Sequence, residues 1–194
     1  MEDLLEQIRQ CRVCESFLAN GANPVMTAST KCKILIIGQA PGKIVHHTGI
    51  PWNDKSGDNL RDWMGIGKAT FYDTDLISLM PMGFCYPGKN KTGDLPPRKE
   101  CAPLWHKKLI MLMPDVKLVL LVGQYAQNYY LGNTRNSTLT ETVSNFQSHL
   151  PQYFPLPHPS PRNNIWQSKN KWFAADVLPE LKKEVNLILH PFIG

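Results

Sequence analysis

Long apolar runs are missing from this sequence: no segment approaches the roughly 18 consecutive apolar residues that a membrane-spanning helix needs. The opening residues, MEDLLE, are acidic and amphipathic, and therefore unlike the basic and then apolar start of a secretory signal. Internal repeats and low-complexity tracts are missing as well. A chain of 194 residues is long enough for one domain and short for two. We therefore expect a single domain over residues 1–194, a monomer in the cytoplasm without a membrane partner.

A strong charge of either sign is also missing. The chain has 21 Lys and Arg residues against 16 Asp and Glu residues, which gives a formal net charge of +5. A mildly basic chain suits a polyanionic partner such as nucleic acid. Many soluble enzymes are equally basic, so the charge supports such a partner without establishing one.

Cysteine is scarce, but four of the five cysteines fall into two pairs. Cys11 and Cys14 have two residues between them, whereas Cys85 and Cys101 lie far downstream and have a wider spacing. A CxxC step on a short turn places two thiolates on one side of the backbone, and a second pair completes four metal ligands. A reducing cytoplasm favours metal ligands or free thiols over disulfides. Four thiolates suit zinc or an iron-sulfur cluster equally well, and Cys85 and Cys101 are alternatively ordinary buried thiols.

Apolar, β-branched runs predict strands that are buried on both faces of a sheet. Such runs occur at 33–38, at 74–80, at 116–122 and, for a fourth strand, up to about residue 156. Cys32 comes just before the first run and is expected to be buried, outside the metal set. Helices are predicted at 4–11, 58–63, 98–113, 124–131 and 169–185, with the tail 186–194 packed back on the body. This alternation predicts an α/β fold, a three-layer α/β/α sandwich with a central, mainly parallel four-stranded sheet.

Two polar loops follow the first and the last predicted strand. The segment GQAPG at 38–42 has glycines that permit a sharp turn and the close approach of a ligand, although it lacks the spacing of a phosphate-binding P-loop. The segment HPSPRN at 158–163 has two prolines that stiffen a loop with an imidazole, a hydroxyl and a guanidinium. Each loop alone is also typical of a surface turn. Because ligands bind beyond the carboxyl ends of parallel strands, we expect the two loops to converge on one ligand.

Taken in order, these features resemble the uracil-DNA glycosylase superfamily, and most of all its iron-sulfur branch, family 4. The resemblance covers nearly the whole chain. It depends on Cys11 and Cys14, GQAPG at 38–42, TGIPW at 48–52, Cys85 and Cys101, the strand 118–123 with LG at 131–132, and HP at 158–159. It implies an enzyme that flips a deaminated base out of DNA, most directly uracil, and hydrolyses its N-glycosidic bond. It also implies a four-iron four-sulfur cluster on the four cysteines, with zinc as the alternative.

The resemblance gives roles to the loop residues. His158 is the implied hydrogen-bond donor to the departing base, together with the backbone N–H groups of Gln39 and Ala40. Trp52 stands where the family has a phenylalanine that stacks on the base, and it is otherwise a core tryptophan. The other residues implied to touch the substrate are Pro41 and Gly42 in the first loop, Ser160 on a phosphate, and Pro161, Arg162 and Asn163 in the segment that presses into the duplex.

The residue that activates water departs from the family pattern. The loop glutamate of the family is Gln39 here, and the acidic residues expected after the loop are replaced by KIVH at 43–46. A general base must therefore come from elsewhere. The nearby candidates are His46, His47 and Asp54, each of which is alternatively a plain loop residue.

Recognition of the base also departs from the pattern. The family reads uracil with an asparagine shortly before the third cysteine, and LMPMGF at 79–84 has no side-chain amide. The backbone of Met82 and Gly83 is the remaining candidate for the base edge. The departure leaves open another deaminated base, such as hypoxanthine, or a DNA-binding module that is non-catalytic or traps its target covalently. A weaker alternative is an N-ribosyl hydrolase that acts on free nucleosides.

The segment between the second pair of cysteines is basic. Its cations are Lys89, Lys91, Arg98 and Lys99. If a cluster fixes the shape of this segment, these side chains are placed to follow DNA phosphates. The alternative is a solvated face.

Overall fold

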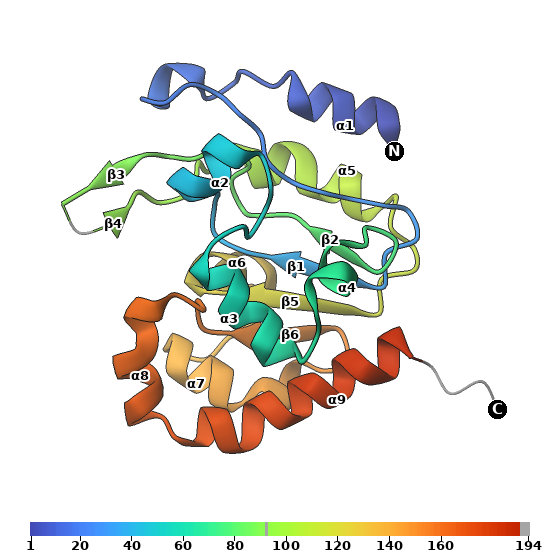
Figure 1. Ribbon diagram of the computed structural model, residues 1–194, viewed down its shortest axis with the longest axis vertical. Coiled ribbons are helices and arrows are strands. Elements are labelled where there is room, and N and C mark those ends of the chain that lie inside the picture. The colour runs from blue at the N-terminus through green and yellow to red at the C-terminus, as the bar shows by residue number, and fades with distance from the viewer. Residues whose placement is uncertain (92, 191–194) are drawn as a thin grey trace.

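The computed structural model describes residues 1–91 and 93–190 and shows a four-stranded sheet between two layers of helices (Figure 1). All four strands of this sheet are parallel, in the order β2-β1-β5-β6. Their bounds are Ile34–Ile37 for β1, Ile77–Leu79 for β2, Leu118–Val122 for β5 and Tyr153–Leu156 for β6. The predicted α/β/α sandwich with a central parallel sheet is therefore confirmed, although each strand is shorter than its apolar run.

Each face of the sheet has its own apolar core, because successive side chains of a strand point to opposite faces. Ile34 and Ile36 of β1 pack with α3, α7 and α9, whereas Leu35 and Ile37 pack with α1, α5 and α6. Complete burial of one such side chain contributes about 1.5 to 3 kcal/mol to the stability of the fold. A strand that is covered on both faces is therefore apolar at every position and does not alternate with polar residues. The helices of the first layer are α3 (Lys55–Met64), α4 (Lys68–Tyr72), α7 (Leu139–Ser144), α8 (Asn164–Lys169) and α9 (Leu178–Leu189). Those of the second layer are α1 (Glu2–Arg9), α5 (Lys107–Ile110) and α6 (Gln124–Leu131).

Several predicted helix bounds are wrong. The helix predicted at 98–113 begins at Ala102 with the π-helical turn Ala102–His106, where Pro103 lacks the N–H that a longer helix would need. The helix predicted at 169–185 begins at Phe173 with the turn Phe173–Val177 and continues as α9 to Leu189. The first part of the predicted tail is therefore helical, and its residues Ile188 and Leu189 pack against the core as predicted. The rest of that predicted tail, 191–194, lies outside the described residues. No helix in the described chain is long and apolar enough to cross a membrane.

Short elements surround the carboxyl edge of the sheet, and the sequence did not predict them. Helix α2 (Lys43–Thr48) directly follows the loop after β1. The antiparallel hairpin of β3 (Lys89–Asn90) and β4 (Gly93–Asp94) comes from the segment between the second pair of cysteines and extends beside α2 (Figure 1). Single 3-10 turns are at Glu15–Phe17, Gly132–Thr134, Phe146–His149 and Pro161–Asn163. Elements of two to six residues are too short for a clear hydrophobic period.

Candidate active site

The carboxyl ends of β1 and β6 bring the two predicted loops together. Residues 38–42 and His158 line one small cavity of about 50 Å3, here called the inner cavity. Its other walls are Val25, Val45, Pro51, Trp52, Asp54, Ser56 and Pro81. A neighbouring space of about 260 Å3, the outer cavity, is lined by Gln39, Ala40, Pro41, Gly93, Asp94, His158, Ser160 and Arg162. The expected convergence of the two loops is thus present in the fold.

Two asparagine side chains hold the loop that contains His158. Asn163 donates a hydrogen bond from Nδ2 to the His158 carbonyl at 2.7 Å, and Asn59 of α3 donates one to the Pro159 carbonyl at 2.8 Å. Asn163 belongs to the segment predicted to press into a DNA duplex, and its amide closes this loop. Asn59 was missed, because its partner lies 100 residues further along the chain. These bonds fix the main chain of the loop independently of the His158 ring.

The environment of His158 favours the neutral imidazole. Burial lowers the pKa of His158 below its usual value of 6.5, while the negative charges of Asp54 and Asp94 act in the opposite direction. At neutral pH the ring is therefore uncharged and has one N–H group to donate. Such a donor can stabilise negative charge on a ligand without bringing a buried positive charge into the cavity.

Of the three residues predicted to activate water, Asp54 alone lines either cavity. It is the N-cap of α3, and its Oδ1 accepts a hydrogen bond from the Gly57 N–H at 2.9 Å. Its Oδ2 lies 4.0 Å from the place that a Cβ atom on Gly42 would take, so this oxygen faces the first loop. The His46 ring lies instead against Tyr86, with 5.9 Å between ring centroids. A ring nitrogen of His47, Nδ1, lies 2.7 Å from the Lys43 carbonyl.

Asp94 is a second carboxylate near His158, and sequence reasoning missed it. Its Oδ2 lies 3.8 Å from the Cβ position of Gly42, and its side chain lines the outer cavity. Asp94 reaches the site from the β3-β4 hairpin, which gave no hydrophobic pattern by which the sequence could place it. Unlike Asp54, it is exposed.

The mouth of the outer cavity contains the predicted duplex-facing residues. Ser160 Oγ accepts a hydrogen bond from the Arg162 N–H at 3.3 Å, within the turn that Pro161 begins. Pro161 and Arg162 are exposed. The guanidinium of Arg162 reaches the hairpin, where its Nη1 lies 3.2 Å from the Cβ position of Gly93. A cation and a hydroxyl therefore lie at the entrance to the cavity that contains His158.

The indole of Trp52 fills much of the space between the two loops. It stacks on the His158 ring, with 5.9 Å between centroids and 29° between planes. It also covers Gly38, where a Cβ atom would come within 2.7 Å of the indole Cζ2. The inner cavity of about 50 Å3 has room for one or two water molecules, because a water takes up about 30 Å3 in the liquid. A pyrimidine ring does not fit there unless a side chain moves.

The backbone of Trp52 is held in a strained conformation by α3. Its φ of 56° is in the left-handed region, which a bulky residue rarely adopts. A Cβ atom on Gly57 would lie 1.8 Å from the Trp52 carbonyl oxygen, so only glycine fits at this position of α3. Arg61 donates to the same oxygen at 3.4 Å, and the Tyr72 hydroxyl donates to the Pro51 carbonyl at 3.1 Å. The main chain around Trp52 is therefore fixed, and rotation of the indole is what would enlarge the inner cavity.

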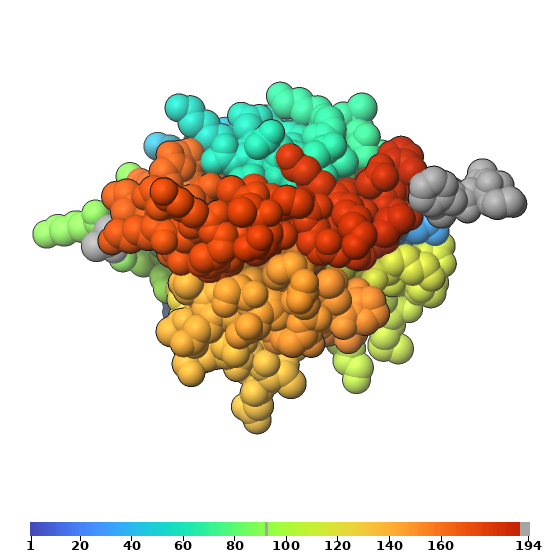
Figure 2. All heavy atoms as spheres, turned by 90° about the horizontal axis from the view of Figure 1, so that it is seen from below, coloured from blue at the N-terminus to red at the C-terminus, as the bar shows by residue number. Residues whose placement is uncertain are grey.

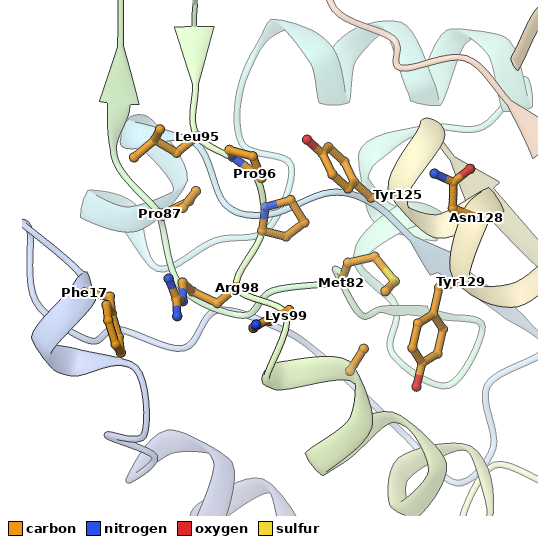
Figure 3. A pocket seen from close by; sticks show the side chains of 12 residues that line it. Phe17, Met82, Pro87, Leu95, Pro96, Arg98, Lys99, Tyr125, Asn128 and Tyr129 are labelled. Carbon is orange, nitrogen blue, oxygen red and sulfur yellow. The ribbon is translucent and has the colours of Figure 1, made fainter. Parts of the chain in front are cut away.

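The predicted contacts to the base edge are placed differently from expectation. The Met82 N–H donates to the Gly38 carbonyl at 2.9 Å and the Gly83 N–H to the Gln39 carbonyl at 3.1 Å, so both donors are used within the fold. The Met82 side chain lines a larger neighbouring cavity (Figure 3). Pro81, which was not singled out, lines the inner cavity instead. The wall opposite the loops is therefore apolar where the family has an amide.

A buried histidine supports Pro81 from behind. His106 is 1% exposed, its Nε2 lies 3.1 Å from the Pro81 carbonyl, and its Nδ1 lies 2.7 Å from the Tyr130 hydroxyl. It also stacks on Phe84, with 14° between the ring planes. Burial lowers the pKa of His106 to about 4, although the Pro81 carbonyl acts in the opposite direction.

This shift predicts that the protein loses stability in mild acid. The unfolded chain takes up a proton on His106 near its usual pKa of 6.5, whereas the folded protein does so only near 4. The stabilisation is fully present above pH 6.5 and is lost as the pH falls toward 4, by about 3 kcal/mol. Urea unfolding at several pH values measures this slope. We expect a shallower slope in His106→Gln and an unchanged one in the exposed control His190→Gln; equal slopes in all three proteins would contradict the assignment.

Comparison with known proteins places the chain in a family. The family model of the uracil DNA glycosylase superfamily matches residues 25–182. The chain belongs to the uracil-DNA glycosylase superfamily. A similar protein is the type-4 uracil-DNA glycosylase of Sulfurisphaera tokodaii, which is 19% identical over 171 residues, covering 82% of this chain and 74% of that protein. The predicted family is thereby confirmed.

In this superfamily member the four paired cysteines lie close enough to affect one another. Cys14, Cys85 and Cys101 are each 7% exposed, and Cys11 is partly buried. Burial, with smaller contributions from the charges of the other paired cysteines, raises the pKa of Cys85 to about 11 and that of Cys101 to about 12. Within the described residues, no three His, Cys, Asp or Glu side chains form a group that could hold a metal ion. Cys32 is fully buried, as predicted, and no other cysteine is among the groups that shift its pKa.

Proposed function

We propose that this protein is a DNA glycosylase that hydrolyses the N-glycosidic bond of a flipped deaminated base, most directly uracil. The observation that supports it best is the meeting of His158, the first loop and Asp54 at one cavity at the carboxyl edge of the sheet. The three groups come from distant parts of the chain and have the chemistry that this reaction needs. The DNA that contains the damaged base is the proposed partner.

The departing base is the centre of the proposed chemistry. Extrusion of the nucleotide costs a few kcal/mol, and contacts to the flipped base and its phosphates offset this cost. As the glycosidic bond breaks, negative charge develops on the base. The neutral His158 ring donates a hydrogen bond to a base carbonyl, and Gln39 and Ala40 line the same cavity, where their N–H groups would add to it. Within the described chain these two N–H groups donate no hydrogen bond to another backbone group.

Asp54 is the proposed general base for the attacking water. One of its oxygens is fixed by the N-cap bond to Gly57, and the other faces the first loop. A carboxylate with one constrained oxygen has a defined orientation, which is what proton transfer requires. Gln39 has no ionisable group, so its proposed contribution is its backbone.

A base must displace the Trp52 indole from His158 before it can bind, and this predicts an unusual gain of activity. Trp52→Phe leaves a smaller ring at the same place and removes most of the stacking on His158. An aromatic pair is worth about 0.5 to 1.5 kcal/mol, so we expect kcat/KM for a uracil-containing oligonucleotide to rise about 2- to 10-fold. Trp172→Phe, which packs against the same core as Trp52 but lines neither cavity, is the matched control. An unchanged or lower kcat/KM would show that the indole is no barrier to the base.

Turnover tests the function. Oligonucleotides with a single uracil, hypoxanthine or normal base are incubated with the protein, and alkali-labile abasic product is measured. The proposal expects product from uracil in preference to hypoxanthine, because the inner cavity is small. The closed cavity favours one other candidate, a damaged-DNA-binding module without turnover. If the protein binds the uracil strand without forming product, or forms a covalent complex that survives denaturation, the protein is that DNA-binding module and not a glycosylase.

An iron-sulfur cluster is proposed on Cys11, Cys14, Cys85 and Cys101. The chemistry of the donors supports it, because four thiols from two distant segments influence one another and three of them are buried away from solvent, although the described side chains are not gathered into a metal-binding group. A cluster bound there would tie the N-terminal segment to the two ends of the β3-β4 hairpin. In this proposal it stabilises structure, and no step of the base excision passes through it.

The cluster predicts about four iron atoms per chain and a visible absorption band in protein purified without oxygen. Cys85→Ser should lose both, because it removes one of four ligands. The control Cys32→Ser should retain both, since Cys32 lies apart from the set. A colourless protein that contains zinc would show that the site binds zinc. A protein that contains neither metal would show that the four cysteines are ordinary buried thiols.

A further inference from the structure

A second, larger cavity lies next to the start of α6 and is separate from the site around His158. Its volume is about 730 Å3, and it shares no lining residue with the inner or the outer cavity. Here it is called the α6 cavity. Figure 3 shows it between α6 on one side and the segment that leads to Cys101 on the other. Its volume lies in the range of pockets that bind small organic ligands, about 300 to 1,000 Å3.

Exposed aromatic rings line the α6 cavity. Tyr125 and Tyr129 are one turn apart on α6 and are 39% and 48% exposed, and Phe17 across the cavity is 62% exposed. Residues four apart on a helix share a face, so both tyrosines face the same space. Figure 3 shows the tyrosines on the α6 side and Phe17 on the far side, next to Arg98. Solvent-facing rings in a concave site provide stacking surfaces for a flat ligand.

The charge of the α6 cavity is positive. Arg98 and Lys99 line it, and no Asp or Glu is among the described residues of its wall. The Arg98 guanidinium lies 4.2 Å above the Phe17 ring and is paired with Glu100, so it is fixed in place. Lys99 has no ion-pair partner in the described chain and is exposed. The wall therefore combines rings that stack with one free cation, the combination that binds a base and its phosphate.

The α6 cavity is joined to the candidate active site by direct contacts. Met82 lines it, and the Met82 N–H bonds to the Gly38 carbonyl of the first loop. Leu95 lines it too, and its carbonyl lies 3.5 Å from the Gln39 side-chain amide nitrogen. These contacts place the α6 cavity beside the first loop of the candidate active site.

We propose that the α6 cavity binds an unpaired nucleotide of a nucleic-acid single strand, with its base stacked on Tyr129 and its phosphate near Lys99. Stacking accepts any base, so binding needs no lesion. The inference therefore stands apart from the excision chemistry. It makes this protein a single-strand binder at a position that the site at His158 does not use.

Fluorescence anisotropy with a labelled, undamaged single strand of about 12 nucleotides tests the proposal. Tyr129→Leu should raise the Kd about 5- to 150-fold, the loss expected when one stacked base loses its ring, whereas Tyr129→Phe should bind like the wild type. Met111→Ala is the matched control, because Met111 is 72% exposed and outside the cavity wall. An unchanged Kd in Tyr129→Leu would overturn the proposal.

Lys99 gives an independent readout. Lys99→Ala should lower the slope of log affinity against log salt by about 0.7, the value for one phosphate contact on a single strand, while Lys107→Ala should not. The strand is undamaged and offers no base to excise, so a failure of the α6 cavity and a failure of the glycosylase are distinguishable. A free nucleoside monophosphate that binds as tightly as the strand would also overturn the proposal, because the strand would then be unnecessary.

Discussion

His158→Ala should lower the single-turnover rate of uracil excision by about 100- to 1,000-fold, the usual loss when one preorganised donor to a developing negative charge is removed. The expectation follows from the place of the ring, at the convergence of both loops, and from its neutral state. The substitution should not collapse the loop, because Asn163 and Asn59 bind main-chain carbonyls that remain. Abasic product formed by excess protein measures the chemical step without product release.

The pH dependence provides a second readout of the same residue. Because burial lowers the pKa of His158, the neutral donor persists below pH 6.5 and the rate should fall only at lower pH, where the ring takes up a proton. This acid limb should disappear in His158→Ala. The exposed control His190→Ala should retain both the rate and the limb. A rate in His158→Ala within a few-fold of the wild type would remove His158 from the mechanism.

The parts of this site that the sequence predicted are those that follow from buried parallel strands. Uninterrupted apolar runs indicated β1 and β5, and the rule that ligands lie beyond carboxyl strand ends placed residues 38–42 near His158. That inference needs no knowledge of side-chain contacts. It fails for residues that reach the site from elements without periodicity, such as Asp94 on a two-residue strand and Pro81 in an irregular segment.

The sequence also could not predict that the Trp52 ring fills most of the space at the inner cavity. Trp52 was predicted to offer a stacking face to a base, but the orientation of its ring depends on a left-handed backbone and on the absence of a side chain at Gly57. Neither feature is encoded locally in a way that composition or spacing reveals. The same holds for Asn59, whose partner is the Pro159 carbonyl. Long-range packing decides such positions, whereas local pattern decides the strands.

Asp54→Asn should lower the rate of excision by about 100- to 10,000-fold, the range for loss of a positioned general base. The substitution suits the position, because asparagine caps a helix as well as aspartate does and retains the bond to the Gly57 N–H. Asp54→Ala would lose this cap as well, at about 1 kcal/mol, and would confuse stability with chemistry. Equal melting temperatures of the wild type and Asp54→Asn would show that the rate reports chemistry alone.

Asp94→Asn is the matched comparison, because both carboxylates approach Gly42 and both raise the pKa of His158. Asp54 is half-buried beside the Trp52 indole and has one oxygen fixed, whereas Asp94 is exposed on the hairpin. We therefore expect the large loss in Asp54→Asn and a small one in Asp94→Asn. The reverse pattern would move the general base to the hairpin. Small losses in both variants would mean that the bond to the base breaks almost completely before water attacks, so that the water needs no base and His158 provides most of the catalysis.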